Sequence, residues 1–203
     1  GKILTKKPLE FTIPQIDLDK REDLQVIISR YKDMYCGHPS SVLLEDGRTM
    51  TIMYPNHHGK GFINWKRSFD AGKTWTEHLP APHDWNNKSG VTGEKIVRDT
   101  NWKVRPPREA CAFDEVPTLY RVKDPNGKER VLMYTGKGAY ARYAVSEDGG
   151  ATWSKMLPLL FDGEPLKETI VLFSDMIRLK NGTYMATFHF PGQVCKAITK
   201  DGL

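Results

Sequence analysis

The sequence predicts an all-β fold, a β-propeller of four-stranded blades of which about three are present, and three observations support this. An eight-residue motif, S-x-D-x-G-x-T-W, occurs at Ser68–Trp75 and again at Ser146–Trp153, and Thr199–Leu203 looks like the start of a third copy. A hairpin signal precedes each copy. A further β-rich run leads into the motif. A four-stranded antiparallel unit repeated in tandem is typical of propeller blades.

The first two strands of each blade are predicted from β-rich runs on either side of a glycine turn. The turns are Asp46-Gly47, Asn126-Gly127 and Asn181-Gly182. Glycine adopts a positive φ without steric cost, so Asp-Gly or Asn-Gly between such runs indicates a tight hairpin. The paired runs are residues 39–44 with 49–54, 117–122 with 130–134, and 175–179 with 183–188.

The third strand of a blade is predicted at 62–67 and at 140–145, and a fourth strand begins after each motif. Blade one then covers about residues 38–80, blade two about 115–158, and an incomplete blade three about 172–203. Because one blade cannot bury both of its faces alone, neighbouring blades must stack. Residues 24–30 are a candidate outer strand of the blade that would close a ring.

The motif itself is predicted to be structural. Its Ser and Asp side chains can bond to turn backbone, its Gly can take the left-handed conformation, and its Trp can pack between blades. The motif therefore indicates a fold and identifies no catalytic residue.

Composition excludes several classes of protein. The chain has 203 residues and a net charge of +5, which fits an anionic partner as well as an ordinary soluble protein. The basic residues form no dense run and no nucleic-acid module motif occurs, so nucleic acid is not an expected partner. No apolar run approaches the roughly 20 residues of a membrane span. Cys36, Cys111 and Cys195 have neither disulfide-framework nor zinc spacing.

The motif pair and its hairpins resemble the sialidase-like (BNR or Asp-box) glycoside hydrolase superfamily. Members are commonly six-bladed propellers, so the resemblance implies half of such a ring. It implies exo-acting hydrolysis of a terminal, acidic sugar of a complex glycan, without a cofactor. The run Tyr54–Gly61 and the run Glu115–Thr118 resemble a bacterial group of Asp-box glycosyl hydrolases. A secreted or periplasmic location is expected, although Gly1–Thr5 lacks the apolar core of an export signal.

Two features of true sialidases are absent. Where those enzymes place an arginine before the first strand of an early blade, this chain has His38-Pro39. Where they place an acidic residue after the second strand, the loop Asn56–Lys60 has no carboxylate. Their tyrosine nucleophile, its glutamate partner and the other arginines belong to later blades, which this sequence does not contain. These differences argue against sialic acid as the sugar.

The meander topology predicts where a site lies. Connections alternate between the two ends of a blade, so hairpins and motifs share one end. The loops after second strands and between blades share the other, called the loop end below. Loops on a rigid scaffold commonly carry function; cations there can bind a sugar carboxylate or sulfate, and carboxylates can serve as acid, base or nucleophile.

The predicted catalytic residues are Glu115, Asp175 and His58. The predicted substrate-binding residues are His38, His57, Lys60, Lys137, Arg142 and His189. We expect at least four of the following seven residues to line one cleft: His38, His58, Lys60, Glu115, Arg142, Asp175 and His189. No metal site is expected, because the histidines have no ligand spacing. The connection 80–114 contains Trp85 and Trp102, a candidate platform for stacking a sugar.

Other interpretations remain open. Each of these residues also fits an ordinary surface or hydrogen-bonding role in a loop. For the chain as a whole, the alternatives are a non-catalytic carbohydrate-binding propeller and a fragment that needs the rest of the ring, supplied by further blades or by oligomerisation. The missing arginine and acid favour binding alone, whereas the ionisable residues at the loop end favour an enzyme.

Overall fold

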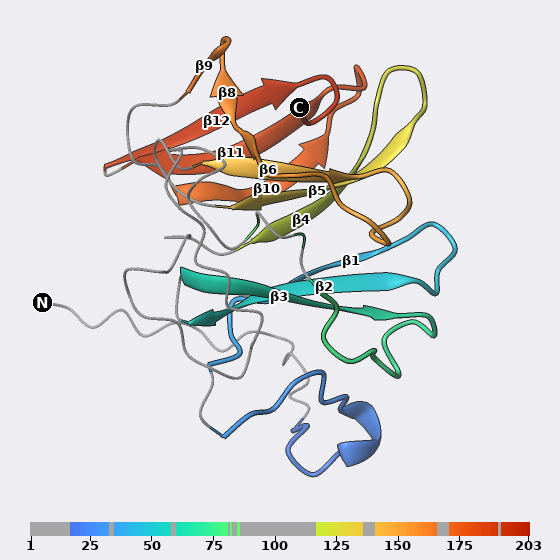
Figure 1. The fold of residues 1–203 in the computed structure, drawn as a ribbon. Helices are drawn as coiled ribbons and strands as arrows, with labels where there is room; N and C mark the ends of the chain where they lie inside the picture. The colour runs from blue at the N-terminus through green and yellow to red at the C-terminus, as the bar shows by residue number, and fades with distance from the viewer. Residues whose placement is uncertain are drawn as a thin grey trace, which may run out of the picture.

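A computed structural model describes residues 17–32, 35–57, 60–80, 82, 85, 117–135, 141–165, 171–190 and 192–203. These residues form antiparallel β-sheets, one 3₁₀ turn and no α-helix, so the all-β prediction is confirmed (Figure 1). In chain order the elements are η1 (Glu22–Leu24), β1 (Ser40–Leu43), β2 (Met50–His57), β3 (Lys60–Ser68), β4 (Thr118–Lys123), β5 (Glu129–Thr135), β6 (Arg142–Ser146), β7 (Leu157–Pro158), β8 (Leu160–Phe161), β9 (Glu164–Pro165), β10 (Val171–Arg178), β11 (Tyr184–Phe190) and β12 (Gln193–Thr199).

Three of the sheets are simple meanders. The first has the order β1-β2-β3, the second β4-β5-β6-β7 and the third β10-β11-β12, and none of them closes on itself within the described residues. A short hairpin, β8-β9, follows the second sheet. The turns at Gly47, Gly127 and Gly182 have φ values of 65°, 85° and 87°. Each predicted hairpin is therefore present, with glycine in the conformation that the turn requires.

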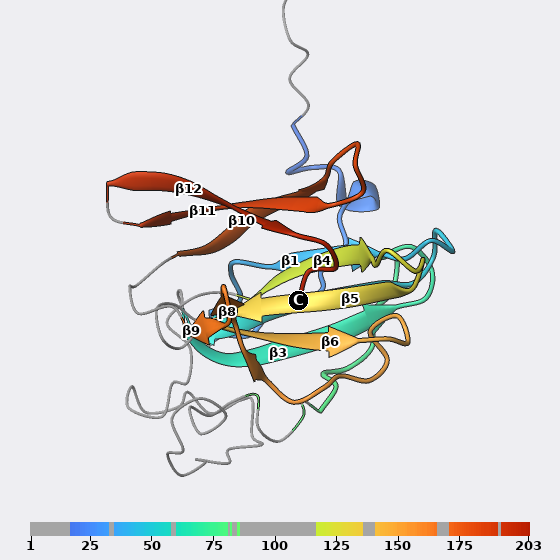
Figure 2. The ribbon, with the colours of Figure 1, turned by 90° about the horizontal axis from the view of Figure 1, so that it is seen from above.

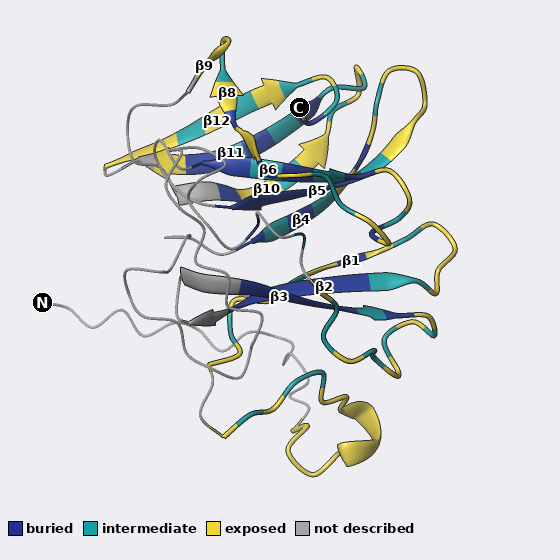
Figure 3. Cartoon of the chain, in the orientation of Figure 1, coloured by how far each residue is buried: buried dark blue, intermediate teal, exposed yellow. Residues whose placement is uncertain are grey.

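The second sheet lies between the other two and is buried on both faces (Figures 1 and 3). Successive residues of a strand point to opposite faces. Accordingly, Val131 and Met133 of β5 pack in a first core against the first sheet, and Leu132 and Tyr134 pack in a second core against the third sheet. The continuous apolar run of β5 is explained by this double burial.

The first strands of the three sheets, β1, β4 and β10, adjoin one another (Figure 2). The amide of Leu119 in β4 donates a hydrogen bond to Ser40 Oγ in β1 at 2.9 Å. The hydroxyl of Tyr120 in β4 donates to the carbonyl of Phe173 in β10 at 3.0 Å. The sheets therefore converge along the edge formed by their first strands.

The repeated motif forms the same turn in both complete copies. In the first, Ser68 Oγ accepts from the amide of Gly72 at 2.8 Å, and Asp70 accepts from the amide and hydroxyl of Thr74 at 2.9 and 2.6 Å. The second copy repeats these bonds at 2.7, 2.9 and 2.5 Å. The hydroxyl and amide of Thr74 hold the pKa of Asp70 at about 2. Gly72 and Gly150 have φ values of 84° and 81°, as the predicted turn requires.

The motif turns also join neighbouring sheets. A Cβ on Gly150 would lie 2.6 Å from Thr51 Oγ1 of the first sheet, so only glycine allows this approach. The indole of Trp153 packs against Trp65 and Trp85 in the first core, at centroid distances of 6.4 and 5.4 Å. The third, partial motif also contacts the second sheet, because the hydroxyl of Tyr134 donates to the carbonyl of Gly202.

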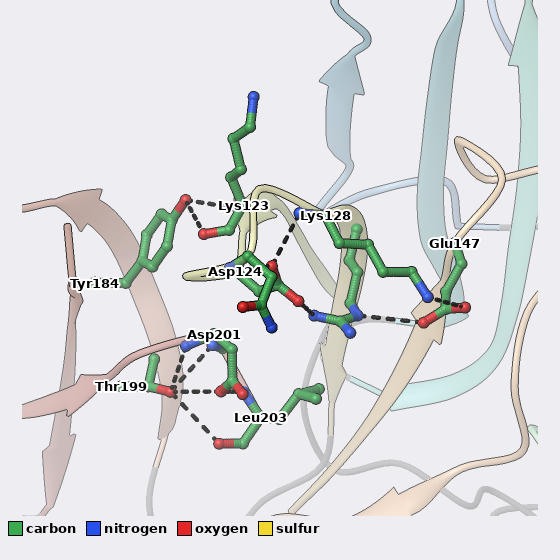
Figure 4. Close-up of polar contacts among 11 residues, drawn as sticks. Lys123, Asp124, Lys128, Glu147, Tyr184, Thr199, Asp201 and Leu203 are labelled. Atoms are coloured by element: carbon green, nitrogen blue, oxygen red, sulfur yellow. Dashed lines mark hydrogen bonds and ion pairs between the residues drawn. The ribbon is translucent and has the colours of Figure 1, made fainter.

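Polar contacts at the turn end hold the β4–β5 hairpin in place (Figure 4). Arg130 bonds to Asp124 of the β4–β5 turn at 2.9 Å and to Glu147 of the second motif at 3.3 Å. The hydroxyl of Tyr184 in β11 accepts from the amide of Lys123 at 2.7 Å. These bonds fix the β4–β5 hairpin against both the adjacent motif turn and the third sheet.

The segment 25–31 covers the face of the first sheet that points away from the second. Lys66 Nζ donates to the carbonyl of Ile28 at 2.8 Å, and Ser29 Oγ lies 2.5 Å from the hydroxyl of Tyr54. Within the structure, residues 24–30 form no β-ladder, so their pairing as the outer strand of a closing blade remains a prediction. Among the described residues, no helix has the length and apolar character needed to cross a membrane.

Candidate functional site

The three meanders point the same way, so their loop ends lie together. The hairpin and motif turns lie at one end, on the right in Figure 1. At the opposite end His57 pairs with Lys60, Thr135 with Arg142, and His189 with Val194. The alternation of connections expected for a meander is therefore present in all three sheets.

Several predicted site residues have no described side chain. Glu115, His58 and Lys137 lie outside the described residues, as do Trp102 and Cys111. His57 and Lys60 are located only by their backbone pairing at the end of β2 and β3. Their roles remain predictions.

Arg142 is a buried cation at the loop end of the second sheet. Its side chain is 1% exposed, and it pairs across the ladder with Thr135, which is also fully buried. Strand alternation places Arg142 on the same face as Ala144, which belongs to the core between the first and second sheets. Hydrogen bonds and ion pairs of a guanidinium buried in this way are strengthened, because the surroundings have a low dielectric constant.

Asp175 and His189 lie together on a different face. Asp175 pairs with Thr187 across the ladder. Along β11, Thr187 and His189 alternate with Ala186 and Phe188, which point into the second core, so Thr187 and His189 point the opposite way. Asp175 and His189 are exposed on the face of the third sheet that points away from the second sheet. The carboxylate of Asp175 accepts from the amide of Met176 at 2.7 Å.

Tyr120 is an ionisable residue near this carboxylate that was not predicted from the sequence. Burial, followed by the negative charge of Asp175, raises the pKa of Tyr120 to about 12. Its position on a first strand was predictable, but its neighbour on β10 depends on the packing of two sheets.

His38 is exposed and precedes β1 with a φ of 50°. Its ring lies 6.1 Å from that of Tyr35. Of the predicted residues that are described, the structure brings Asp175 and His189 onto one face of the third sheet and places Arg142 between the first and second sheets. Whether four of the seven share one cleft depends also on Glu115 and His58, and remains a prediction.

A second polar cluster, which was not predicted, lies on the covered face of the first sheet. The hydroxyl of Tyr54 lies 2.5 Å from both His78 Nε2 and Ser29 Oγ, and that of Tyr31 lies 3.3 Å from His78 Nδ1. Burial, and then the nearby charge of Lys66, lower the pKa of His78 to about 4. Burial raises the pKa of Tyr54 well above its usual range. Both groups are therefore neutral near pH 7. The cluster depends on the docking of residues 25–31, for which the sequence has no local signal.

Cavities among the described residues are further candidates for binding. One, of about 290 Å³, lies beside this cluster and is lined by Ser29, Cys36, Ile52 and Tyr54, among others. The other, of about 510 Å³, lies between the second and third sheets. None of the predicted site residues lines either cavity.

One expectation is wrong. Trp85 was expected to be an exposed stacking platform, but it is fully buried in the first core, and its indole N–H donates to the carbonyl of Ser154 at 3.1 Å. Its ring packs against that of Trp153 in the second motif, which removes it from solvent. Among the described residues no three His, Cys, Asp or Glu side chains are grouped to hold a metal ion, and neither Cys36 nor Cys195 forms a disulfide bond.

Comparisons with known proteins identify a fold neighbour and no family. No family model matches the chain. No curated protein matches it. A crystal structure of a protein of unknown function from Dyadobacter fermentans DSM 18053 is similar, with a TM-score of 0.50 and 18% sequence identity. The alignment covers 87% of this chain and 50% of that one, so the chain spans half of the neighbour's length. At this identity the likeness concerns the fold alone.

Proposed function

We propose that this chain is part of an Asp-box β-propeller of the sialidase-like type. The sheets are its blades, stacked around a channel lined by β1, β4 and β10. Support comes from the two motif turns with matching hydrogen bonds, each following a three-stranded meander. The chain would then supply half of a six-bladed ring, with further blades or a second copy supplying the rest.

We propose further that the loop end hydrolyses a terminal, acidic sugar of a complex glycan outside the cytoplasm. The observation that carries this is Arg142, a buried guanidinium at the loop end. Such a group is suited to a sugar carboxylate or sulfate, since a charge-assisted hydrogen bond gains strength away from water. In this proposal Glu115 or Asp175 transfers protons, with His58 as a further acid or base, and His38, His57, Lys60, Lys137 and His189 contact the glycan.

A non-catalytic glycan-binding propeller is the second candidate. The exposed position of Asp175 and His189 favours it, because neither side chain is desolvated as catalytic groups commonly are. The two functions share the same loop end and the same acidic ligand, and they differ only in turnover.

The test is a panel of aryl glycosides, carrying neutral, uronic acid and sialic acid sugars, combined with a glycan array. We expect turnover of an acidic glycoside, reduced about 10²–10⁴-fold by whichever of Glu115→Gln and Asp175→Asn removes the proton-transfer group. Arg142→Gln should raise KM for acidic more than for neutral glycosides. Glu164→Gln, an exposed carboxylate in the β8–β9 hairpin, is the matched control and should leave the rate unchanged.

Glycan binding without turnover of any substrate would support the binding module instead. If neither acidic glycan binding nor turnover is found, the carbohydrate proposal is wrong, whatever the fold.

A further inference from the structure

Residues 25–31, called the strap below, are attached to the first sheet through side chains. Among the described residues the strap forms no β-ladder with that sheet. Instead, Ser29 Oγ lies 2.5 Å from the hydroxyl of Tyr54. The hydroxyl of Tyr31 lies 3.3 Å from His78 Nδ1. A segment held in this way can open locally while the sheet beneath it stays folded.

The sheet side of this attachment is fixed by backbone hydrogen bonds. The amides of Thr76 and Leu79 donate to carbonyls of β3 at 2.9 and 3.1 Å, so the segment that carries His78 lies along the edge of the first sheet. The hydroxyl of Tyr54 in β2 lies 2.5 Å from His78 Nε2. The imidazole of His78 therefore links this edge segment, β2 and the strap.

A cation lies beneath the strap, close to the imidazole. Lys66 of β3 is buried, and its Nζ donates to the carbonyl of Ile28 at 2.8 Å. A proton on His78 would place a second positive charge in the same half-buried space. The titratable groups that face the imidazole are Tyr54 from β2, Lys66 from β3 and Tyr31 from the strap, with Glu77 beside it in the chain.

We propose that the strap is a latch operated by pH, which a proton on His78 opens so that the outer face of the first sheet is uncovered. Opening exposes the imidazolium and Lys66 to water, where neither charge is desolvated. The cavity of about 290 Å³ has walls from residues 26–30 of the strap and from Ile52 and Tyr54 of β2, so it exists only while the latch is closed. This inference does not depend on the proposed glycosidase activity.

Protonation favours the open strap over a defined range of pH. In the closed state burial, and second the charge of Lys66, lower the pKa of His78 from 6.5 to about 4. Opening returns the group toward its ordinary value, so the open state gains population as pH falls through this range. Because His78 is only half-buried, we expect the opening equilibrium to rise about tenfold between about pH 7 and about pH 5.

The experiment measures opening of the strap by cleavage with thermolysin, which cuts beside large apolar residues such as those of the strap. A locally opened segment is cut in proportion to its open population when closing is fast. The full chain and a free peptide with the sequence of residues 22–32 are digested at both pH values, and the ratio of their cleavage rates corrects for the protease's own pH dependence. We expect this ratio to rise about tenfold, with first cuts in the strap and an unchanged near-UV circular dichroism spectrum.

Three variants assign the effect. His78→Gln removes the titrating group and should limit the rise to less than about twofold. His38→Gln, at an exposed histidine outside the cluster, is the matched control and should keep the full rise. Tyr54→Phe removes the hydroxyl between Ser29 and His78, so its cleavage ratio should already be raised near neutral pH.

The proposal is overturned if the cleavage ratio of the unmodified chain is the same at both pH values, or if His78→Gln rises as steeply as His38→Gln. It is also overturned if Tyr54→Phe leaves the ratio unchanged near neutral pH. Cleavage of the strap only together with the rest of the chain would mean that the whole molecule unfolds, and this result would exclude a latch as well.

Discussion

At the scale of single residues, one aspartate organises each motif turn. Asp70 and Asp148 each bind the amide and the hydroxyl of the threonine four residues later. These bonds explain why the motif requires Asp and Thr at fixed spacing. The glycine of the second motif has a further requirement, because it adjoins another sheet.

We predict that Gly150→Ala destabilises the protein more than Gly163→Ala does. Both glycines have φ values above 80°, so both substitutions cost roughly 1–3 kcal/mol in backbone strain. Only at Gly150 does the new Cβ meet another group, Thr51 Oγ1 at 2.6 Å, whereas nothing lies within 4 Å at Gly163. Overpacking should add at least about 1 kcal/mol, measurable by urea unfolding. Equal losses for the two variants would show that the cross-sheet contact is unimportant.

We predict that His78 makes the protein acid-sensitive. Its pKa is lowered from 6.5 to about 4 in the folded state, first by burial and second by Lys66, while Glu77 opposes the shift. Between these pH values the unfolded chain binds the proton that the folded chain excludes, so the free energy of unfolding falls as pH falls. His78→Gln should lose less stability across this window. Urea unfolding of both proteins from about pH 7.5 to pH 4 tests this, and parallel curves would contradict it.

At the scale of elements, the two motif tryptophans have different environments. Trp153 packs against Trp65 and Trp85 between two sheets, whereas Trp75 donates its indole N–H to the carbonyl of Gly72 in its own turn. We predict that Trp153→Ala is the more destabilising. Because Trp153 is only half-buried, the loss should fall below the roughly 3–5 kcal/mol of a fully buried ring. Thermal unfolding of the matched pair tests this, and a larger loss for Trp75→Ala would refute the packing argument.

The sequence predicts those elements whose formation depends on side chains close together in the chain. The glycine hairpins, the third strands and the motif turns all follow from side chains within a few residues of one another. The β8–β9 hairpin also has a local signal, Asp162-Gly163 with both φ values positive, and was not predicted. Its strands are two residues long, too short for a periodicity to be visible.

Features that depend on contacts between sheets were not predicted. The burial of Trp85 depends on contact with the second blade, where its indole N–H donates to the carbonyl of Ser154. The Tyr54–His78 cluster requires residues 25–31 to dock on the first sheet. Among the candidate site residues, the sequence predicts which strand end each occupies, but only the packing shows that Arg142 is buried while Asp175 is exposed.

At the scale of the whole molecule, the outward face of the third sheet carries exposed apolar side chains beside the charged Asp175 and Lys196. Ile177, Val194 and Ile198 are 45%, 87% and 54% exposed, whereas the second sheet has both faces covered. We predict concentration-dependent self-association through this face, because exposed apolar patches promote association. Val194→Lys should weaken it, and Leu24→Lys, at an exposed leucine of η1, should not. Sedimentation velocity at several concentrations tests this, and a monomer throughout would contradict the prediction.

The central position of the second sheet determines the order in which the sheets unfold locally. Stacked units interact only with their neighbours, so opening begins at the outer units, and the central unit is exposed last. Amide hydrogens of β5 can then exchange with solvent only after both adjoining sheets have separated from it. Amide hydrogen exchange should therefore be slowest in β5, faster in β2 and β11, and fastest in β12. The exchange rate would then depend on the position of a strand in the stack of sheets and not on its position in the sequence.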